Sequence, residues 1–382
     1  MGSSDMLRAC FFGTYDSSYP GNQALIEGLR RHGVDVIECH IALWEKEPVK
    51  EEHYFDLWSL TKLFAHFVVD IGGLLVRAVR LPPCPVIITS FNGYLDLPIA
   101  KILAWAWRSK LLFNPMMSIY DTLVLDRRYF RPGTIMARLI LWLERVLYTL
   151  PDALLVDSKT HFQFFADYLK CPWTKFRRLP FGVDDRMFYP RQQTRSDDHF
   201  QVLFYGKYQP LQGVVTIIEA AKRLENDPDV RFLVIGYGPT WHEVQQRAQE
   251  LRVQNVRFLR WVDFDQLPEV ISQADVCLGV FGVSDKIDRC IANKVVQALA
   301  MRKPVITGYT KAMGEVLNDR EQVLFCERGN PQALAEAIVE LKENADLREK
   351  IAAQGYEAFL QYFSPSAIGA MARRYLEEMI GS

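Results

Sequence analysis

The stretch FQVLFYGKYQPLQGVVTIIEAAKRLENDPDVRFLVIGYGP (200–239) contains the pattern that decides the fold. An apolar strand at Val202–Tyr205 ends in a glycine-containing turn, a helical pattern follows over 214–224, and a second apolar strand covers Arg231–Ile235. Strands joined by a helical crossover of this length run parallel. The stretch therefore predicts a strand–helix–strand unit within a parallel sheet that helices cover on both faces.

The same alternation continues on both sides of this stretch and forms two series, one in each half of the chain. The other predicted strands are Leu7–Phe12, Val34–Cys39, Val86–Thr89, Leu111–Phe113, Ala153–Val156, Val256–Phe258, Val276–Val280 and Pro304–Thr307, and the other predicted helices are NQALIEGLRRHG (22–33), Trp241–Leu251 and Asn293–Met301. Two such series predict an α/β protein of two Rossmann-like domains. The polar, non-periodic segment RQQTRSDDHF (191–200) is the predicted linker, and SPSAIGAMARRYL (364–376) is the predicted closing helix.

Composition agrees with two domains and excludes some classes of protein. The 382 residues suffice for two cores, and the net charge of −1 argues against nucleic acid as a partner. The seven cysteines are scattered, with Cys277 and Cys326 in apolar runs, which is typical of reduced, buried thiols. The start MGSSD resembles an added tag and leads directly into a strand, so no signal peptide is expected. The apolar stretch Leu60–Leu81 contains five charged or His residues, so we expect a cytoplasmic protein without a membrane-spanning helix.

Six motifs, in a fixed order, resemble those of the retaining family 4 glycosyltransferases. They begin with PFGVDDRMFYP (180–190) and FYGKYQPLQGVVTIIEAAKRL (204–224), and continue with VRFLVIGYGP (230–239), NVRFLRWVDFDQLPEVISQADV (255–276), IANKVVQALAMRKPVITG (291–308) and PQALAEAIVELKENADLREKI (331–351). The resemblance implies the GT-B fold, in which two Rossmann-like domains face each other across a cleft. It assigns acceptor binding to residues 1–185 and donor binding to 186–382, and returns the terminal helix 364–382 to the first domain. It also implies a metal-independent enzyme with no cofactor.

Two lysines are the cations that the resemblance assigns to the donor phosphates. Lys207 follows the first strand of the second series, where side chains of a parallel sheet point into the crevice at its carboxyl edge. Lys294 stands at the start of the predicted helix 293–301, whose free N–H groups also attract an anion. Cations there would stabilise the charge that develops on the departing pyrophosphate. An ordinary surface lysine is the alternative at both positions.

The sequence departs from the family pattern at three positions. Gln212 replaces the second lysine of the family motif and keeps a hydrogen-bond donor without the charge. Arg289 and Gln297 stand where the family has a pair of glutamates, of which the second binds the ribose. Gln297 can accept such a hydrogen bond, but Arg289 cannot. The sequence therefore does not identify the sugar, and it also allows an inactive relative of the family.

The remaining candidate residues come from the positions of the motifs. Asp121, in SIYDT (118–122), lies where relatives carry a catalytic-site His, and it is a candidate for contacting the acceptor or the sugar, with a helix N-cap as the alternative. The first turn of the N-terminal domain corresponds to the family's glycine-rich loop, with an ordinary turn as the alternative. The donor-binding set is Gly13, Gly21, Asn22, Gln212, Gly213, Gly236, Trp261, Val262, Phe281, Asn293 and Gln297.

Two other motifs favour structural interpretations. The glycines of VIGYGP, Gly236 and Gly238, lack the third glycine of a dinucleotide fingerprint, so we expect close packing or approach to the donor. The D-x-D pairs 227–229 and 263–265 could hold a metal ion on a pyrophosphate. The first pair is predicted as a turn, and Asp265 is predicted as the N-cap of the helix that follows it.

Residues 101–145 combine tryptophans with an excess of positive charge. Eight Lys or Arg and three acids fall within 101–150, together with Trp105, Trp107 and Trp142. Such a segment can lie on an anionic membrane surface. The expected protein is then peripheral on the inner face of the cytoplasmic membrane. Burial of the tryptophans in the core is the alternative.

These observations predict a hexosyltransferase of polysaccharide or cell-envelope glycan synthesis. The donor is a nucleoside diphosphate sugar, with UDP preferred and UDP-glucose assumed, and the acceptor is a saccharide or a lipid-linked saccharide. The reaction retains configuration, by front-face substitution in which the donor phosphate takes the proton. A UDP-sugar 2-epimerase of the same fold and a non-catalytic nucleotide-sugar-binding relative are the alternatives.

Overall fold

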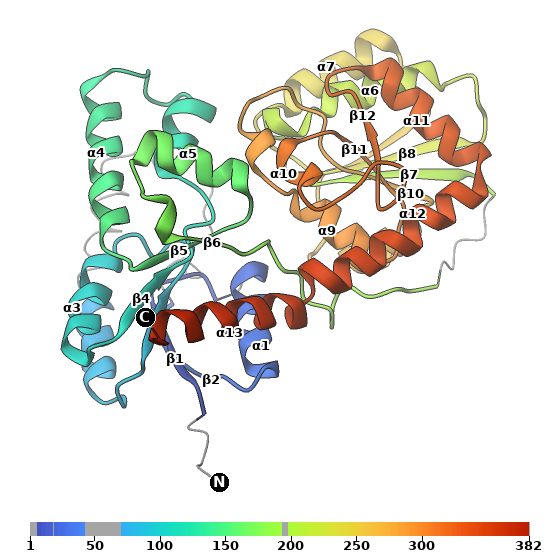
Figure 1. Cartoon of the computed structure of the whole chain (residues 1–382). Helices are drawn as coiled ribbons and strands as arrows, with labels where there is room; N and C mark the ends of the chain where they lie inside the picture. Colours follow the sequence, from blue (N-terminus) through green and yellow to red (C-terminus); the bar gives the residue numbers. More distant parts are fainter. Residues whose placement is uncertain (1–5, 18, 43–69, 193–197, 382) are drawn as a thin grey trace. The chain divides into compact units, whose positions relative to one another are not determined.

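The computed structural model describes residues 6–17, 19–42, 70–192 and 198–381, and it divides into two compact units (Figure 1). Unit 1 comprises Met1–Pro180 and Pro365–Ser382, and unit 2 comprises Phe181–Ser364. Each unit is built on a six-stranded sheet in which the paired strands run parallel. The predicted fold class, with two Rossmann-like α/β domains and a C-terminal closing helix, is confirmed.

The sheet of unit 1 has the strand order β2-β1-β3-β4-β5-β6. Its strands are β1 (Arg8–Gly13), β2 (Asp35–His40), β3 (Val86–Thr89), β4 (Lys110–Phe113), β5 (Ala153–Val156) and β6 (Phe176–Arg178). Strands β3 and β5 are buried along their whole length, as expected of parallel strands with helices on both faces.

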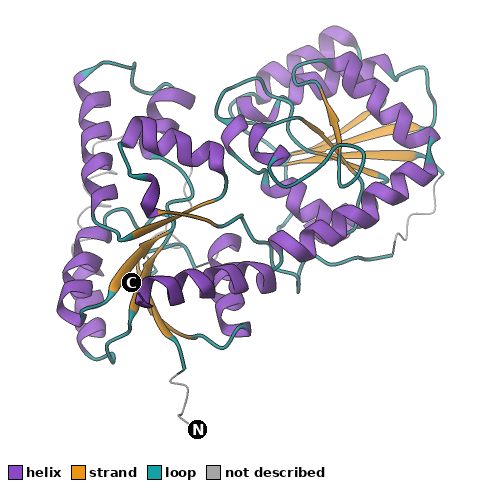
Figure 2. Cartoon of the chain, viewed as in Figure 1, coloured by secondary structure: helices purple, strands orange, loops and turns teal. Residues whose placement is uncertain are grey.

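Helices cover both faces of this sheet (Figure 2). They are α1 (Pro20–Arg31), α3 (Leu97–Trp107), α4 (Ile135–Thr149), α5 (Lys159–Leu169) and α13 (Pro365–Gly381), with a π-helical turn η2 (Asp121–Asp126) and a 3-10 turn η3 (Trp173–Lys175). Alternate residues of β1 point to opposite faces, so Phe11 joins the core under α1 and α13 while Phe12 joins the core under α3 and α5. Helix α13 packs closely on α1, because a Cβ atom at Gly369 would lie 2.0 Å from the carbonyl oxygen of Gly28.

The sheet of unit 2 has the strand order β12-β11-β10-β7-β8-β9. Its strands are β7 (Phe200–Tyr205), β8 (Val230–Ile235), β9 (Val256–Leu259), β10 (Val276–Leu278), β11 (Val305–Gly308) and β12 (Leu324–Cys326). The helices are α6 (Val214–Arg223), α7 (Trp241–Leu251), α8 (Leu267–Ser272), α9 (Asn293–Ala300), α10 (Lys311–Gly314), α11 (Pro331–Glu343) and α12 (Ala345–Ala358), with shorter turns η4 (Pro210–Gln212), η5 (Ile287–Arg289) and η6 (Phe359–Phe363). The core on one face of this sheet contains side chains of α6, α7 and α11.

The polar segment 191–200 is not the linker between the units, contrary to the prediction. Residues 181–192 already belong to unit 2, where the N–H of Val183 donates to the carbonyl of Phe363 at 3.2 Å and Phe188 is buried. The segment therefore does not lie at the boundary between the units. Residues 193–197 of this segment, the N-terminal MGSSD and residues 60–69 of the apolar stretch lie outside the described residues.

Candidate functional site

The strand order of unit 2 places a crevice at the carboxyl ends of β7 and β10. Strand β7 pairs with β8 on one side and with β10 on the other. After β7 the chain adds β8 and β9 on one side of it, and then adds β10, β11 and β12 on the other side. The boundary between β7 and β10 is therefore the topological switch point of the sheet. Ligands of open parallel sheets bind at such a point, outside the carboxyl ends of the strands.

Glycines allow the loops at this edge to approach one another. Gly206, directly after β7, has φ +143, and Gly236, directly after β8, has φ +140. A Cβ atom at Gly236 would lie 1.9 Å from the carbonyl oxygen of Gly206, and one at Gly238 would lie 2.8 Å from the amide nitrogen of Tyr208. The interpretation of Gly236 and Gly238 as close-packing positions is confirmed, because no side chain fits at either position.

Lys294 presents a buried amine at this edge. It lies in the first turn of α9, is 7% exposed, and its Nζ has no hydrogen-bond partner among the described residues. The Nζ atom lies 3.6 Å from the centroid of the Phe204 ring, and a Cβ atom at Gly206 would come within 2.9 Å of it. Desolvation by burial lowers the pKa of Lys294 well below its ordinary value of 10.5. A buried ammonium group without a partner is costly, and an anion beside Nζ would reduce that cost.

Three more side-chain atoms in the neighbouring loops are buried without a hydrogen-bond partner among the described residues, namely Tyr208 Oη, Gln212 Oε1 and Ser284 Oγ. Gln212 ends the turn η4 after β7, and Ser284 follows β10. The backbones of these two loops are joined, because the N–H of Phe281 donates to the carbonyl of Gln212 at 3.0 Å. Buried polar atoms without partners are rare in folded proteins. They lie in the loops that follow β7 and β10, at the topological switch point of the sheet.

The other predicted residues of this edge differ in exposure. Lys207 is exposed directly after β7, whereas Gln297 is buried on α9, three positions after Lys294. Arg289 is half-buried at the end of η5, and Asn293 is the first residue of α9. The lysine and glutamine of α9 therefore lie on one side of the helix, as residues three apart do. Gly213, with φ +65, is the N-cap of α6.

Trp261 and Val262 lie at the carboxyl end of β9, at the edge of the sheet and two strands from β7. Trp261 is 75% exposed, and its Nε1 donates to Oδ1 of Asp263 at 3.0 Å. The prediction that Asp265 caps the following helix is wrong, because α8 begins at Leu267 after Gln266, which has helical φ and ψ and no side-chain cap. The backbone carbonyl of Asp263 accepts the N–H groups of Gln266 and Leu267 instead.

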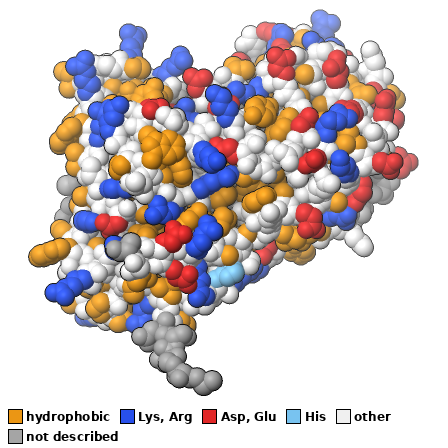
Figure 3. All heavy atoms as spheres, in the orientation of Figure 1, with side chains coloured by type: hydrophobic (Ala, Val, Ile, Leu, Met, Phe, Trp, Pro, Cys, Tyr) orange, Lys and Arg blue, Asp and Glu red, His pale blue; other side chains and the backbone are white. Residues whose placement is uncertain are grey.

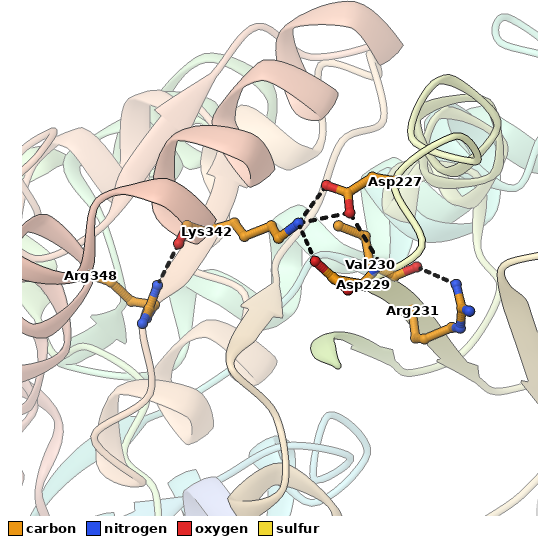
Figure 4. A network of polar contacts seen from close by, with 6 residues as sticks. All are labelled: Asp227, Asp229, Val230, Arg231, Lys342 and Arg348. Carbon is orange, nitrogen blue, oxygen red and sulfur yellow. Dashed lines mark hydrogen bonds and ion pairs between the residues drawn. The ribbon is translucent and has the colours of Figure 1, made fainter. Parts of the chain in front are cut away.

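The D-x-D pair 227–229 forms an ion pair network with α11 (Figure 4). Nζ of Lys342 lies 2.6 Å from Oδ2 of Asp227 and 3.3 Å from Oδ2 of Asp229. The N–H of Asp229 also donates to Oδ1 of Asp227 at 3.1 Å, which fixes the turn before β8. The structural interpretation of this pair as a turn is confirmed. Within the described ranges, no group of three or more His, Cys, Asp or Glu side chains could hold a metal ion.

Unit 1 has a corresponding switch point between β1 and β3, since β1 lies between β2 and β3. Gly13 ends β1 with φ +129, and a Cβ atom there would lie 2.3 Å from Oδ2 of Asp96. Asp96 is fully buried and accepts the N–H of Thr14 at 2.7 Å and its hydroxyl at 3.1 Å. Burial raises the pKa of Asp96 to about 6, while the bonds from Thr14 act to lower it. The carboxylate thus fixes the turn that follows β1.

Asn22 supports the same turn from α1. It is fully buried, its Nδ2 donates to the carbonyl of Asp16 at 2.7 Å, and its Oδ1 accepts the hydroxyl of Ser90. Both ends of the amide are therefore used within unit 1. Gly21 is buried in the first turn of α1.

Asp121 is buried at the start of η2. The alternative that it is a helix N-cap is wrong, because its own N–H donates to Ser118 Oγ at 3.1 Å, so Ser118 occupies the capping position. Glu144 of α4 accepts the N–H groups of Ile119 and Tyr120 at 2.8 and 2.9 Å and the hydroxyl of Ser118 at 2.9 Å. Burial raises the pKa of Glu144 to about 7, against these hydrogen bonds, which lower it. Glu144 thereby sets the position of the turn that carries Asp121.

Among the described residues, Asp96 and Glu144 are two buried carboxylates that the motifs do not predict. A signal existed for Glu144, because helical spacing places it with Ala137 and Tyr148 on the buried face of α4. An acid on an inward face needs hydrogen-bond donors and therefore indicates a polar site beneath the helix. Asp96 has no comparable signal, since its partner Thr14 is 82 residues away in the sequence.

Comparison with known proteins identifies relatives for the second half of the chain. Residues 185–358 match the family described as Glycosyl transferases group 1. An uncharacterized glycosyltransferase of Methanocaldococcus jannaschii is 28% identical over 198 residues, which are 52% of each chain. The phosphatidyl-myo-inositol mannosyltransferase of Mycobacterium leprae is 32% identical over 164 residues, which are 42% of each chain. The chain thus spans about half the length of the curated relatives it matches.

Solved structures share the fold of the whole chain. Sucrose-phosphate synthase of Thermosynechococcus elongatus has a TM-score of 0.72 with 18% identity, and the match covers 98% of this chain and all of that one. HepE of Anabaena, solved with UDP and glucose, has a TM-score of 0.66 with 16% identity, over 97% of this chain and all of that one. At these identities the likeness establishes the fold, which is that of two-domain glycosyltransferases.

Proposed function

Because residues 185–358 form a glycosyl transferases group 1 domain, we propose that the chain transfers a hexose from a nucleoside diphosphate sugar to an acceptor hydroxyl. Glycan synthesis is the proposed setting, since lipopolysaccharide core glycosyltransferases of Rhizobium meliloti are among the relatives. The acceptor is a saccharide or a lipid-linked saccharide. Configuration at the transferred carbon is retained, and no metal ion takes part.

The observation that carries this proposal is the buried amine of Lys294. It has no anionic partner among the described residues and lies in the first turn of α9, whose free N–H groups favour negative charge. A diphosphate supplies the missing anion and the hydrogen-bond acceptors. Lys207, exposed at the end of β7, adds a second cation from the same edge of the sheet.

The proposed chemistry requires charge stabilisation at the leaving group. The bond between the sugar C1 and the β-phosphate oxygen breaks, and the acceptor oxygen forms a bond to C1 on the same face. The proton of the acceptor hydroxyl passes to the departing phosphate oxygen, so the products are the glycoside and the free nucleoside diphosphate. Lys294 and Lys207 stabilise the negative charge that grows on the phosphate as the bond breaks. Asp121 of unit 1 is the proposed contact to the acceptor or the sugar.

Thermal unfolding with nucleotides tests the donor site. UDP is the first ligand to try, because HepE was solved with UDP and with UDP-glucose, and GDP and ADP serve as comparisons. A ligand at 100 times its dissociation constant stabilises the folded state by about 2.7 kcal/mol. If none of the three nucleotides at millimolar concentration raises the unfolding temperature, the proposed donor site is contradicted.

Product analysis separates transfer from the two alternatives. A transferase releases the nucleotide in proportion to glycoside formed on an added saccharide acceptor. A 2-epimerase converts the nucleotide sugar without any acceptor and releases no glycoside. A non-catalytic relative binds the nucleotide and leaves the nucleotide sugar intact.

A further inference from the structure

Helix α4 of unit 1 carries an exposed apolar stripe. The stripe consists of Ile135, Met136, Leu139, Trp142, Leu143 and Val146, whose exposed fractions range from 43% at Val146 to 87% at Ile135. At about 100° per residue, these six positions fall within an arc of about 120° on the helix. The stripe therefore forms a continuous face along the length of α4.

This face is not the side by which α4 packs into unit 1. The inward side carries Ala137, Glu144 and Tyr148, all buried, and Glu144 holds the turn at 118–120. These positions lie opposite the stripe on the helical wheel. A helix of a globular protein normally has one apolar face, turned to the core. Helix α4 has a second one, and an exposed patch of this kind marks an interaction surface.

The segment that carries the stripe has an excess of positive charge. Residues 127–149 contain five arginines and one acid, and that acid is the buried Glu144. Arg128 and Arg131 are exposed just before α4, and Arg138 is exposed on its flank. Helix α3 adds Trp105, which is 83% exposed, and Ile102, which is 66% exposed. Figure 3 shows hydrophobic and basic side chains interspersed over the part of unit 1 that carries these helices.

Trp105 and Trp142 are thus exposed and not core residues, whereas Trp107 packs against the core of unit 1, as the alternative expected. No helix within the described residues is both long enough and apolar enough to cross a bilayer. An interfacial helix, by contrast, needs an apolar face that enters the acyl boundary and a basic rim that meets anionic headgroups.

We propose that the stripe of α4, with its arginine rim, docks the chain on the surface of a bilayer that contains anionic lipid. Charge complementarity selects this occupant over a second copy of the chain. A two-fold symmetric dimer would bring the stripe against itself and the arginines against arginines, with no exposed acid in 127–149 to pair with them. The docking surface belongs to unit 1 and does not depend on the donor site of unit 2.

The test is co-sedimentation of the full chain with vesicles of phosphatidylcholine, with and without phosphatidylglycerol. We expect binding to the anionic vesicles, weakened by salt because headgroup attraction is screened. Replacing Ile135, Leu139 and Trp142 together by Gln should lower the partition coefficient by at least about tenfold. The matched control replaces Met6, Leu360 and Ile380 by Gln, which are also exposed apolar residues and lie outside the stripe.

A second pair of variants tests the rim. The first variant should bind anionic vesicles more weakly than wild type, because it replaces the exposed rim residues Arg128, Arg131 and Arg138 by Gln. The control variant should bind like wild type. It makes the same change of charge on unit 2, at Arg223, Arg257 and Lys350. Circular dichroism and the nucleotide-induced thermal shift should be unchanged in all of them, so failure of the donor site would be visible separately.

Three results would overturn the proposal. Equal binding to neutral and anionic vesicles would contradict the role of the arginines. Absence of binding to both, or equal loss of binding in the control variants, would contradict the role of the stripe. Self-association in light scattering that the stripe variant abolishes would show instead that α4 joins two copies of the chain.

Discussion

Replacing Lys294 by Met is expected to stabilise the ligand-free chain and to remove its affinity for nucleotides. In the ligand-free protein the amine is 7% exposed, and its Nζ has no hydrogen-bond partner among the described residues. A buried polar group without a partner costs about 1–3 kcal/mol. Met keeps the length of the side chain and its contact with the Phe204 ring but removes this cost. At about 2–4 °C per kcal/mol, the midpoint of thermal unfolding should rise by about 2–12 °C.

The matched control is Lys303, a lysine of the same unit whose Nζ donates to the carbonyls of Ser272 at 2.6 Å and Ala274 at 2.9 Å. Lys303→Met should lower the unfolding midpoint, because two carbonyls lose a charged donor, and should keep the shift with UDP. The pH dependence gives an independent readout. The unfolded chain binds more protons than the folded one between the lowered pKa of Lys294 and 10.5, so this residue makes the stability of the wild type rise with pH there. Lys294→Met should lack that rise.

The assay is differential scanning fluorimetry of the three proteins with and without UDP, supported by calorimetry. We expect Lys294→Met to unfold at a higher temperature than wild type and to lose most of the ligand-induced shift. A variant that is less stable than wild type and still shifts with UDP would refute the reasoning, because Lys294 would then be a structural residue.

The remaining predictions concern turnover, metal ions and buried carboxylates. Lys207→Ala should lower turnover by about 10²-fold without loss of secondary structure, as removal of one group that stabilises transition-state charge typically does, and near-wild-type turnover would show that the phosphate contact lies elsewhere. EDTA should leave activity unchanged, because Asp227 and Asp229 are engaged by Lys342; loss of activity that Mn²⁺ restores would contradict this. The raised pKa of Glu144 should make the free energy of unfolding fall as pH rises from 4.5 to about 7, and urea titrations of Glu144→Gln should lack this contribution. In the wild type, the raised pKa of Asp96 should make the free energy of unfolding fall as pH rises from 3.8 to about 6, and Asp96→Asn should lack this fall. The variant should also be less active, because the turn at Thr14 loses its carboxylate. If the free energies of unfolding of wild type and variant differ by the same amount at every pH in that interval, the assignment to Asp96 is wrong.

The central strands and the edge strands β2 and β9 could be predicted from the sequence, whereas the edge strands β6 and β12 could not. The predicted strands at Val86–Thr89 and Ala153–Val156 have the bounds of β3 and β5, because strands buried on both faces are continuous apolar runs. Strand β6, with the sequence FRR, and strand β12, with LFC, lie at sheet edges and are three residues long. A run of three residues is too short to show a pattern by itself, and FRR is mostly polar, so β6 and β12 emerge only from pairing with a neighbour.

The candidate site shows the same division. The positions of Lys207 and Lys294 at the carboxyl edge of a parallel sheet follow from the order of strands and helices along the chain. The burial of Lys294 against Phe204 does not, because it depends on how α9 packs on the sheet. The same holds for Glu144, whose donors at 118–120 are 24 to 26 residues away in the sequence. Contacts between residues far apart in the sequence leave no local pattern, so these parts of the site could not be predicted from the sequence.

The return of α13 to unit 1 has a consequence for the order in which the protein folds during synthesis. All of unit 2 lies between the two segments of unit 1, so the ribosome completes unit 2 before α13 is made. Until then the face of the first sheet that carries Phe11 lacks Ile368, Ala372 and Leu376, which belong to its core. Because domains generally fold as they emerge, the nascent chain passes through a state in which the second unit is folded and one apolar face of the first is covered only in part, by α1. That state is the one in which chaperones have a surface to bind.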